Sequence, residues 1–274
     1  MVCVKVYILA DNIVNKRGLV AEHGLSIFVE HQELKILFDT GQSSVYCHNA
    51  GLMGIDLAQT DCIILSHGHY DHCDGLIHLP HMDTFPMVYV HPAAFEKRFN
   101  AGSGKSIGIS WNIDDYPIIR NRLFYNQKEL SPYPGVHLLT EIPISTDLED
   151  TPQSFSKESS GQIVVDNFID EQALIIETSK GLVVFLGCSH PGIISCLDYI
   201  QEMFPDQSIY ALFAGMHMEK ATSLRVQLII QYMLNSNISK IVPLHCTGIV
   251  AISEMKRALE ERCLILTTGD VLEL

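Results

Sequence analysis

The sequence predicts a mixed α/β (α+β) fold, and two kinds of apolar pattern carry this prediction. The first forty residues alternate as half-buried strands do, with Val4, Val6 and Ile8 on one face. Beyond them come short continuous apolar runs, which are typical of strands buried on both faces of a sheet. Helical stretches separate several of these runs. A core built from sheets and helices is therefore expected.

The expected strands follow the chain in a regular order. A strand at the start is followed by a hairpin with strands at 26–30 and 34–38, which ends at the turn 39–41. A short helix is then expected around 47–50. The continuous apolar runs predict further strands at 62–65, 88–90, 183–186, 210–213, 241–244 and 263–266.

Three longer helices are predicted between and after these runs. The clearest covers about 219–236, where apolar residues recur with the period of one helix face. Those residues are Val226, Ile229, Ile230, Met233 and Leu234. A second helix follows Pro191, and a third covers about 250–262.

Length and composition favour a single domain over residues 1–274. Hydrophobic residues make up 47% of the chain, which allows a sizeable core, and a charged fraction of 18% argues against disorder. Two segments, at about 93–135 and 145–165, lack the apolar periodicity for a core of their own. We expect both to be lid-like insertions near a site.

The charge balance and the cysteines limit the partners. With 18 basic and 32 acidic residues the net charge is −14, which disfavours nucleic acid because phosphate binding needs Lys and Arg. We expect no membrane span, since no run of about 18 apolar residues occurs. The first residues lack signal-peptide features, and the eight cysteines form no C-x-x-C pair. A cytoplasmic protein acting on a small molecule is predicted, with its oligomeric state left open.

Ligand-type side chains follow five of the predicted strands. They occur in His67-Gly68-His69-Tyr70-Asp71-His72, in Gly187-Cys188-Ser189-His190, in His245-Cys246-Thr247-Gly248, at Asp39 and at His217. In open α/β sheets, ligand sites gather beyond the carboxyl ends of the strands. The five strand ends therefore predict one convergent site.

The residue types at this site point to metal binding. His67 and His69 are two apart, so at an extended strand end both rings point the same way. Asp71 and His72 follow where the chain turns into a helix, and they can face a second ion. Imidazole with some oxygen suits zinc, with iron or manganese as alternatives, so one or two divalent cations are expected. The distant donors that complete the site are predicted to be His190 and His245.

Three further residues keep open roles at this stage. Cys188 is a ligand, a supporting group or a buried thiol, with equal weight for each reading. His217 is a ligand, a substrate contact or a residue at a helix start. Asp39 is expected to orient a ligand histidine rather than to bind metal.

The run 67–72 after a buried strand, preceded by the turn 39–41, resembles the metallo-β-lactamase superfamily. The resemblance extends to the final strand around 268–270 and so covers nearly the whole chain. It implies a four-layer αββα sandwich with a one- or two-metal site along one edge of the sheets. The ligands that it implies are His67 and His69 for one cation, and Asp71, His72 and His245 for the other.

The chain departs from the family pattern in the middle of the sequence. Cys188 stands where many members carry a bridging Asp, and Asp170 with Glu171 lies nearest to the expected loop His. We infer that His190 supplies the missing imidazole, with Asp170 as an alternative oxygen donor. The segments 187–192 and 243–248 are similar to a subgroup that includes the archaeal dihydropterin-ribofuranosylaminobenzene phosphate synthases.

The resemblance implies a metal-dependent hydrolase that attacks an ester, lactone, thioester or phosphoester with a metal-bound hydroxide. Asp71 would orient the water or accept its proton, and His217 or Thr247 would hold the developing oxyanion. The subgroup adds a transferase of the synthase type as the first alternative. An iron-dependent redox enzyme and a metal-binding protein without catalysis are the others.

Overall fold

The computed structural model describes residues 4–80, 84–146, 149 and 154–274. The chain divides into two compact units. The first unit comprises Met1–Gln127, Gln153–Asp170 and Thr267–Leu274, and the second comprises Lys128–Pro152 and Glu171–Leu266. Each unit contains its own large β-sheet.

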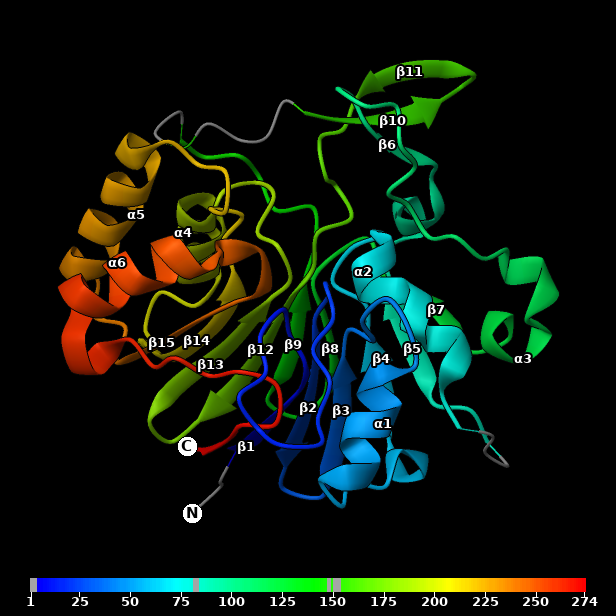
Figure 1. Ribbon diagram of the computed structural model, residues 1–274, viewed down its shortest axis with the longest axis horizontal. Helices are drawn as coiled ribbons and strands as arrows, with labels where there is room; N and C mark the ends of the chain where they lie inside the picture. The colour runs from blue at the N-terminus through cyan, green and yellow to red at the C-terminus, as the bar shows by residue number, and fades with distance from the viewer. Residues whose placement is uncertain (1–3, 81–83, 147–148, 150–153) are drawn as a thin grey trace. The chain divides into compact units, whose positions relative to one another are not determined.

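The first unit is built on a sheet that has seven strands within the described residues, in the order β16-β1-β2-β3-β4-β5-β7 (Figure 1). The strands are β1 (Val4–Ala10), β2 (Ser26–His31), β3 (Leu34–Phe38), β4 (Cys62–Ile64), β5 (Met87–Val90), β7 (Leu123–Tyr125) and β16 (Val271–Glu273). The order β16-β1-β2-β3 is antiparallel, whereas β3, β4, β5 and β7 run parallel. The carboxyl ends of β3, β4 and β5 therefore lie at one edge of this sheet.

Helix α1 (Val45–Leu52) covers part of this sheet through Tyr46 and Ala50, which join the buried cluster around Leu37 and Ile63. Short helical turns complete the unit. They are η1 (Leu57–Gln59), α2 (Tyr70–Cys73), η2 (Asp74–His78), η3 (Pro92–Phe95), η4 (Ile113–Asp115) and α3 (Pro117–Arg120). Helix α2 is the element into which the histidine run turns after β4.

A small sheet joins the two segments that lack a core of their own. Strand β10 (Phe155–Ser159) pairs with β11 (Gln162–Val165) on one side and with β6 (Arg98–Asn100) on the other. The segment 93–135 also supplies β7 and β8 (Leu130–Tyr133) as edge strands of the two large sheets. Residues 147–148 and 150–153 of the second segment lie outside the described residues. The lid role, like the single domain, stays a prediction.

The second unit is built on a sheet that has six strands in the described chain, in the order β15-β14-β13-β12-β9-β8. Its remaining strands are β9 (Val136–Leu139), β12 (Ala173–Thr178), β13 (Gly181–Leu186), β14 (Ile209–Gly215) and β15 (Lys240–Leu244). Strands β13, β14 and β15 run parallel to one another. Their carboxyl ends therefore lie side by side.

Three helices cover this second sheet: α4 (Ile193–Met203), α5 (Ser223–Asn235) and α6 (Ile249–Leu259). Their buried apolar residues share one cluster with Leu212 and Ile241 of the sheet. Turns η5 (His245–Thr247) and η6 (Glu260–Arg262) flank α6. The apolar period predicted for α5 is buried at Val226, Ile229 and Met233.

Most predicted elements coincide with observed ones, and one prediction is wrong. The run 263–266 forms only a single bridge, between Cys263 and Ile241, and no strand. Cys263 is buried there but Ile265 is 47% exposed, so the run is not enclosed on both faces as continuous apolar strands are. Strands β9 and β12 were not predicted, and the last strand starts at Val271, just beyond 268–270.

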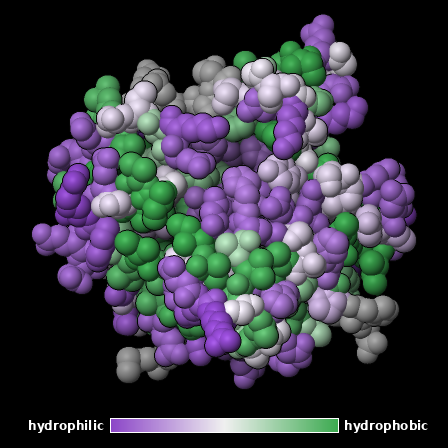
Figure 2. All heavy atoms as spheres, in the orientation of Figure 1, coloured by the Kyte–Doolittle hydropathy of each residue, from purple (hydrophilic) through white to green (hydrophobic). Residues whose placement is uncertain are grey.

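Figure 2 shows hydrophobic and hydrophilic residues interspersed over one face of the molecule. Such a mixture is ordinary, because more than half of a folded protein's accessible surface is apolar. Among the described residues, none of the helices combines the length and the apolar character that crossing a membrane requires.

Helix α5 offers a matched test of this packing. Ile229 is fully buried against the second sheet, whereas Leu234 is 43% exposed, although both belong to the same apolar period. We expect Ile229→Ala to lower the free energy of unfolding by about 2–5 kcal/mol because it leaves a cavity. Leu234→Ala should change it by less than about 0.5 kcal/mol. Urea unfolding of both variants checks this, and equal losses would contradict the placement of α5.

Candidate metal centre

In the first unit, Asp39 organises the end of two neighbouring strands. It follows β3 directly, has a positive φ of 57° and is fully buried. Its carboxylate accepts hydrogen bonds from the backbone N–H and the hydroxyl of Ser66, both at 2.7 Å. It also accepts the Nδ1 proton of His72 at 2.6 Å. Asp39 therefore orients the His72 ring, and its role in supporting a metal ligand stays a prediction.

The rings of His67, His69 and His72 are buried together. The ring of His67 lies 4.7 Å from that of His69 and 4.2 Å from that of His72, measured between centroids. The Nε2 atom of His67 is 3.1 Å from Nδ1 of His69, and the Ser66 hydroxyl lies 2.9 Å from Nδ1 of His67. The strand-end geometry thus brings three imidazoles to one place.

Asp71 lies on the same turn, in helix α2. Its Oδ2 atom is 4.0 Å from Nε2 of His72 and 3.2 Å from Nε2 of His23. The side chain of His23 is 49% exposed and lies beside Asp71. Because His23 lies far from the motif in the sequence, no local spacing points to this contact.

A buried ion-pair network holds the backbone of the histidine run. The Gly68 N–H donates to Oδ2 of Asp170 at 2.7 Å, and Oδ1 of Asp170 lies 2.7 Å from Nη2 of Arg98. Arg98 also pairs with Asp166 at 2.7 Å and donates to the Ala94 carbonyl at 3.1 Å. We call this network of Arg98, Asp166 and Asp170 the Arg98 clamp. A side chain at Gly68 would collide with the Ala94 carbonyl oxygen and with the guanidinium of Arg98. Asp170 thus holds the backbone between His67 and His69.

Two phenylalanine rings lie beside His69. The ring of Phe155 lies 5.5 Å from that of His69, and the ring of Phe168 lies 5.9 Å from it. The two phenylalanines are 5.6 Å apart and nearly perpendicular, the edge-to-face arrangement that aromatic pairs prefer. Phe155, from strand β10 in the predicted insertion, and Phe168, just beyond that insertion, therefore form an apolar wall beside His69.

In the second unit, His190 follows β13 and is oriented by a carboxylate. Its Nδ1 atom lies 2.9 Å from Oε2 of Glu171, which is fully buried. Glu171 also accepts the backbone N–H of Ser189 at 3.0 Å, and the Ser189 hydroxyl donates to the Gly215 carbonyl at 2.8 Å. Sequence reasoning missed Glu171 as a partner of His190, because 19 residues separate the two.

His217 and His245 follow β14 and β15, and both have positive φ angles, of 47° and 48°. Such conformations are uncommon outside glycine and gather at functional sites. The ring of His217 lies 5.1 Å from that of His190. Burial first, and then the neighbouring His190, lower the pKa of His217 to about 3, so its imidazole is neutral at physiological pH.

The Thr247 hydroxyl is engaged inside the fold. It accepts the backbone N–H of Met216 at 3.1 Å and donates to the Ala214 carbonyl at 3.4 Å, so it connects η5 to the end of β14. Both contacts are structural, and the oxyanion role predicted for Thr247 draws no support from them.

Arg225 and Glu149 support the loops that carry His190 and His217. Arg225, on α5, donates to the His217 carbonyl at 2.8 Å and lies 3.4 Å from Glu149. Glu149 accepts the Ile194 N–H at 2.6 Å, at the start of α4. The carboxylate satisfies an N-terminal N–H of that helix, where negative charge is favourable.

These donors suit a divalent cation. In each unit a buried carboxylate accepts the Nδ1 proton of a histidine, Asp39 for His72 and Glu171 for His190. This arrangement fixes the tautomer in which Nε2 carries the lone pair, the state of metal-binding histidines. Within the first unit the candidate ligands are His67, His69, Asp71 and His72, and within the second they are His190, His217 and His245.

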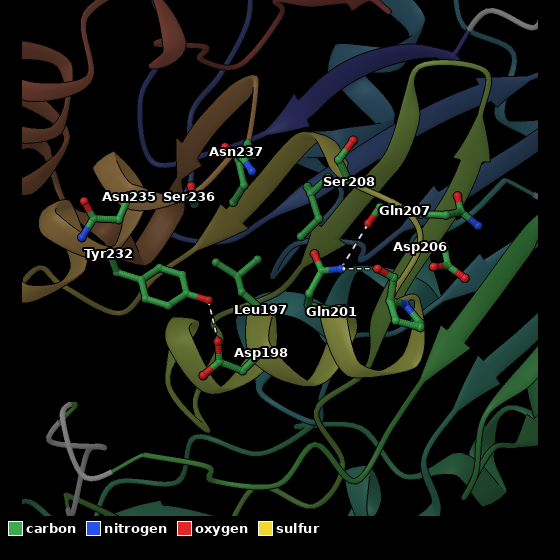
Figure 3. Close-up of a pocket in the computed structure, with 13 residues that line it drawn as sticks. Leu197, Asp198, Gln201, Asp206, Gln207, Ser208, Tyr232, Asn235, Ser236 and Asn237 are labelled. Carbon is green, nitrogen blue, oxygen red and sulfur yellow. Dashed lines mark hydrogen bonds between the residues drawn. The ribbon is translucent and has the colours of Figure 1, made fainter.

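The opposite end of the second sheet carries a different surface. A hollow of about 530 Å³ lies between α4 and α5, near the amino ends of β14 and β15 (Figure 3). The Tyr232 hydroxyl donates to Asp198 across it at 2.6 Å, and the Gln201 amide donates to backbone carbonyls. No histidine or cysteine is among the described residues that line it.

The chain is similar to known proteins over most of its length. Residues 19–151 match the family model described as the metallo-beta-lactamase superfamily. The chain is 30% identical over 261 residues to the 7,8-dihydropterin-6-methyl-4-(beta-D-ribofuranosyl)-aminobenzene-5'-phosphate synthase of Methanocaldococcus jannaschii, which covers 90% of this chain and 89% of that protein. An uncharacterized protein of the same archaeon is also 30% identical, over 251 residues, with 91% and 93% covered.

Solved structures confirm the predicted fold class. A metal-dependent hydrolase of the beta-lactamase superfamily superposes with a TM-score of 0.85 at 28% identity, over 99% of both chains. Zn²⁺-bound PqqB from Methylobacterium extorquens superposes with a TM-score of 0.60 at 15% identity, over 98% of this chain and 100% of that one. The second likeness concerns the fold alone.

The Arg98 clamp can be tested against an exposed ion pair. Arg98→Met leaves Asp166 and Asp170 buried without their cation, so we expect a loss of about 3–5 kcal/mol in the free energy of unfolding. Arg120→Met removes an exposed partner of Asp114 and should cost less than about 1 kcal/mol. Urea unfolding of the metal-free proteins measures both. Similar losses would show that Arg98 is not a buried clamp.

The lowered pKa of His217 predicts a pH dependence of stability in the metal-free protein. The unfolded chain has an ordinary histidine pKa of about 6.5, so below that pH it binds a proton that the folded state refuses until about pH 3. The contribution of His217 is therefore intact above about pH 6.5 and is lost as the pH falls toward 3. Urea unfolding in EDTA at about pH 7.5 and about pH 5 should show a smaller fall for His217→Gln than for the wild type. Equal falls would contradict the prediction.

Proposed function

We propose that this chain, which belongs to the metallo-beta-lactamase superfamily, is an enzyme that binds one or two divalent cations. One cation would be held by His67 and His69 with His190. A second would be held by Asp71 and His72 with His245. Zinc is the favoured ion, since imidazole with carboxylate oxygen suits it, and iron or manganese are the alternatives.

The observation that carries this proposal is the repeated carboxylate–histidine pair. Asp39 holds His72 at 2.6 Å and Glu171 holds His190 at 2.9 Å, each within a buried strand end. A buried histidine that only fills space has no need of a fully buried carboxylate, whose burial costs free energy unless it is well paired. Two such pairs, each at the carboxyl end of a strand, support orientation toward cations.

The leading reaction is hydrolysis of an ester, lactone, thioester or phosphoester. A bound divalent cation would supply Lewis acidity and lower the pKa of water to about 7. Asp71 would accept a proton, a role that its buried carboxylate beside His72 and His23 supports. His217, held neutral, can donate a ring N–H to an oxyanion of a small-molecule substrate. The similarity to a structure named as a metal-dependent hydrolase supports this choice.

A transferase of the synthase type is the second candidate. It is supported by the 30% identity to a protein named as a 7,8-dihydropterin-6-methyl-4-(beta-D-ribofuranosyl)-aminobenzene-5'-phosphate synthase, over most of both chains. The phenylalanine wall beside His69 is compatible with a planar substrate ring. The supporting residues are the same in both reactions, so the products distinguish them.

His67→Ala tests the proposal directly. We expect the variant to lose most of its bound zinc and at least about 100-fold in rate, because it removes a ligand and not only a ligand's support. His137→Ala, which replaces a half-buried histidine paired with Glu177, should keep both. Metal analysis by mass spectrometry is combined with hydrolysis of ester, lactone, thioester and phosphodiester substrates and with a synthase assay on a pterin pyrophosphate.

The outcomes separate the candidates. Hydrolysis that depends on His67 supports the leading reaction, and carbon–carbon bond formation that depends on it supports the synthase. Full activity with unchanged metal content in His67→Ala would refute the metal centre. Iron alone in the protein as isolated, with oxygen consumption, would favour a redox enzyme in its place, and bound metal with no activity would favour a metal-binding protein.

A further inference from the structure

Two cysteines lie beside a predicted metal ligand in the second unit. The sulfur atoms of Cys188 and Cys246 and one ring nitrogen of His245 all lie within 4.8 Å of one another, and all three residues are buried. Cys188 follows β13, whereas His245 and Cys246 follow β15 in η5. The three side chains therefore come together from strands that are not neighbours in the sheet.

Gly215 explains how this approach is achieved. Strand β14 lies between β13 and β15, which should hold the outer two about 9.6 Å apart. Strand β14 ends at Gly215, where a Cβ atom would lie 2.8 Å from the Cys246 sulfur and 3.4 Å from Cα of Cys188. The φ angle of Gly215 is not positive, so the backbone conformation does not demand glycine. What requires glycine is the lack of space, because the same Cβ atom would collide with the Gly187 carbonyl oxygen as well as lying close to the Cys246 sulfur.

The Cys246 sulfur is also held in place by a backbone donor. It accepts the N–H of His217 at 3.3 Å, and His217 is itself fixed by Arg225 through its carbonyl. Outer contacts of this kind orient metal ligands. A thiol that served only as a small apolar filler would need no such donor.

We propose that Cys188, His245 and Cys246 form a mixed sulfur–nitrogen site for a soft divalent cation. The inference deepens the proposed function, because it assigns two sulfur ligands to the cation that His245 is proposed to hold. Sulfur with imidazole selects zinc, cobalt or ferrous iron over magnesium, calcium and manganese. These three residues supply part of the coordination of this cation, and Asp71 and His72 are the proposed donors for the rest.

Cobalt(II) substitution of the reduced full-length protein tests the site. Sulfur bound to cobalt gives a near-ultraviolet charge-transfer band that nitrogen and oxygen ligands do not give. We expect this band in the wild type, about half of it in Cys188→Ser and in Cys246→Ser, and zinc affinity lower by on the order of 100-fold in each. Cys196→Ser is the matched control, because Cys196 is a buried cysteine on α4 outside the cluster.

The possible results discriminate clearly. Cobalt bound with visible ligand-field bands but without the charge-transfer band overturns the sulfur site and leaves the proposed function standing. A protein that binds no cobalt overturns both. A band that survives either substitution unchanged overturns the three-residue site. Thermal unfolding of the metal-free variants, matched to Cys196→Ser, shows that lost binding does not reflect lost folding.

Discussion

The buried carboxylate that accepts a histidine ring proton is the interaction on which the rest of the site depends. Asp39 does this for His72 and Glu171 does it for His190, at 2.6 and 2.9 Å. A charged group without water must be satisfied locally, so each carboxylate also collects backbone N–H groups of the adjoining turn. The carboxylates thereby fix both the rings and the loops that carry them.

The remaining constraints in each unit act on the loops rather than on the ligands. Arg98 and Asp170 hold the backbone at Gly68, and Arg225 holds the carbonyl of His217. Asp39, His217 and His245 have positive φ angles at strand ends. These strained backbone conformations persist because the surrounding hydrogen bonds and packing stabilise them. The candidate ligands are thus held in position by neighbouring carboxylates and arginines. The hydrophobic core of each unit offsets the unfavourable strain and burial of these groups.

How much was predictable depended on whether the signal was local. The hairpin at β2 and β3, the buried strands β4, β13, β14 and β15, and helix α5 follow from apolar period over a few residues. The strand predicted at 263–266 was wrong because apolar residues alone do not show whether other elements will cover both faces of a segment. Strands β9 and β12 were missed, and so were Glu171, Arg98 and Arg225, because their partners lie far away in the chain.

The sequence by itself determined the histidine run, its place after a buried strand and therefore the kind of chemistry, because ligand type and short spacing are properties of adjacent residues. Only the tertiary structure decided which carboxylate orients which histidine, that Asp170 holds the Gly68 backbone, and that Cys188 meets Cys246 beside His245. Those relations arise where separate strands end at one edge of a sheet, and sheet order is set by long-range packing. The residue types that make the chain a candidate metal binder are thus local features of the sequence, whereas the contacts among those residues come from the fold.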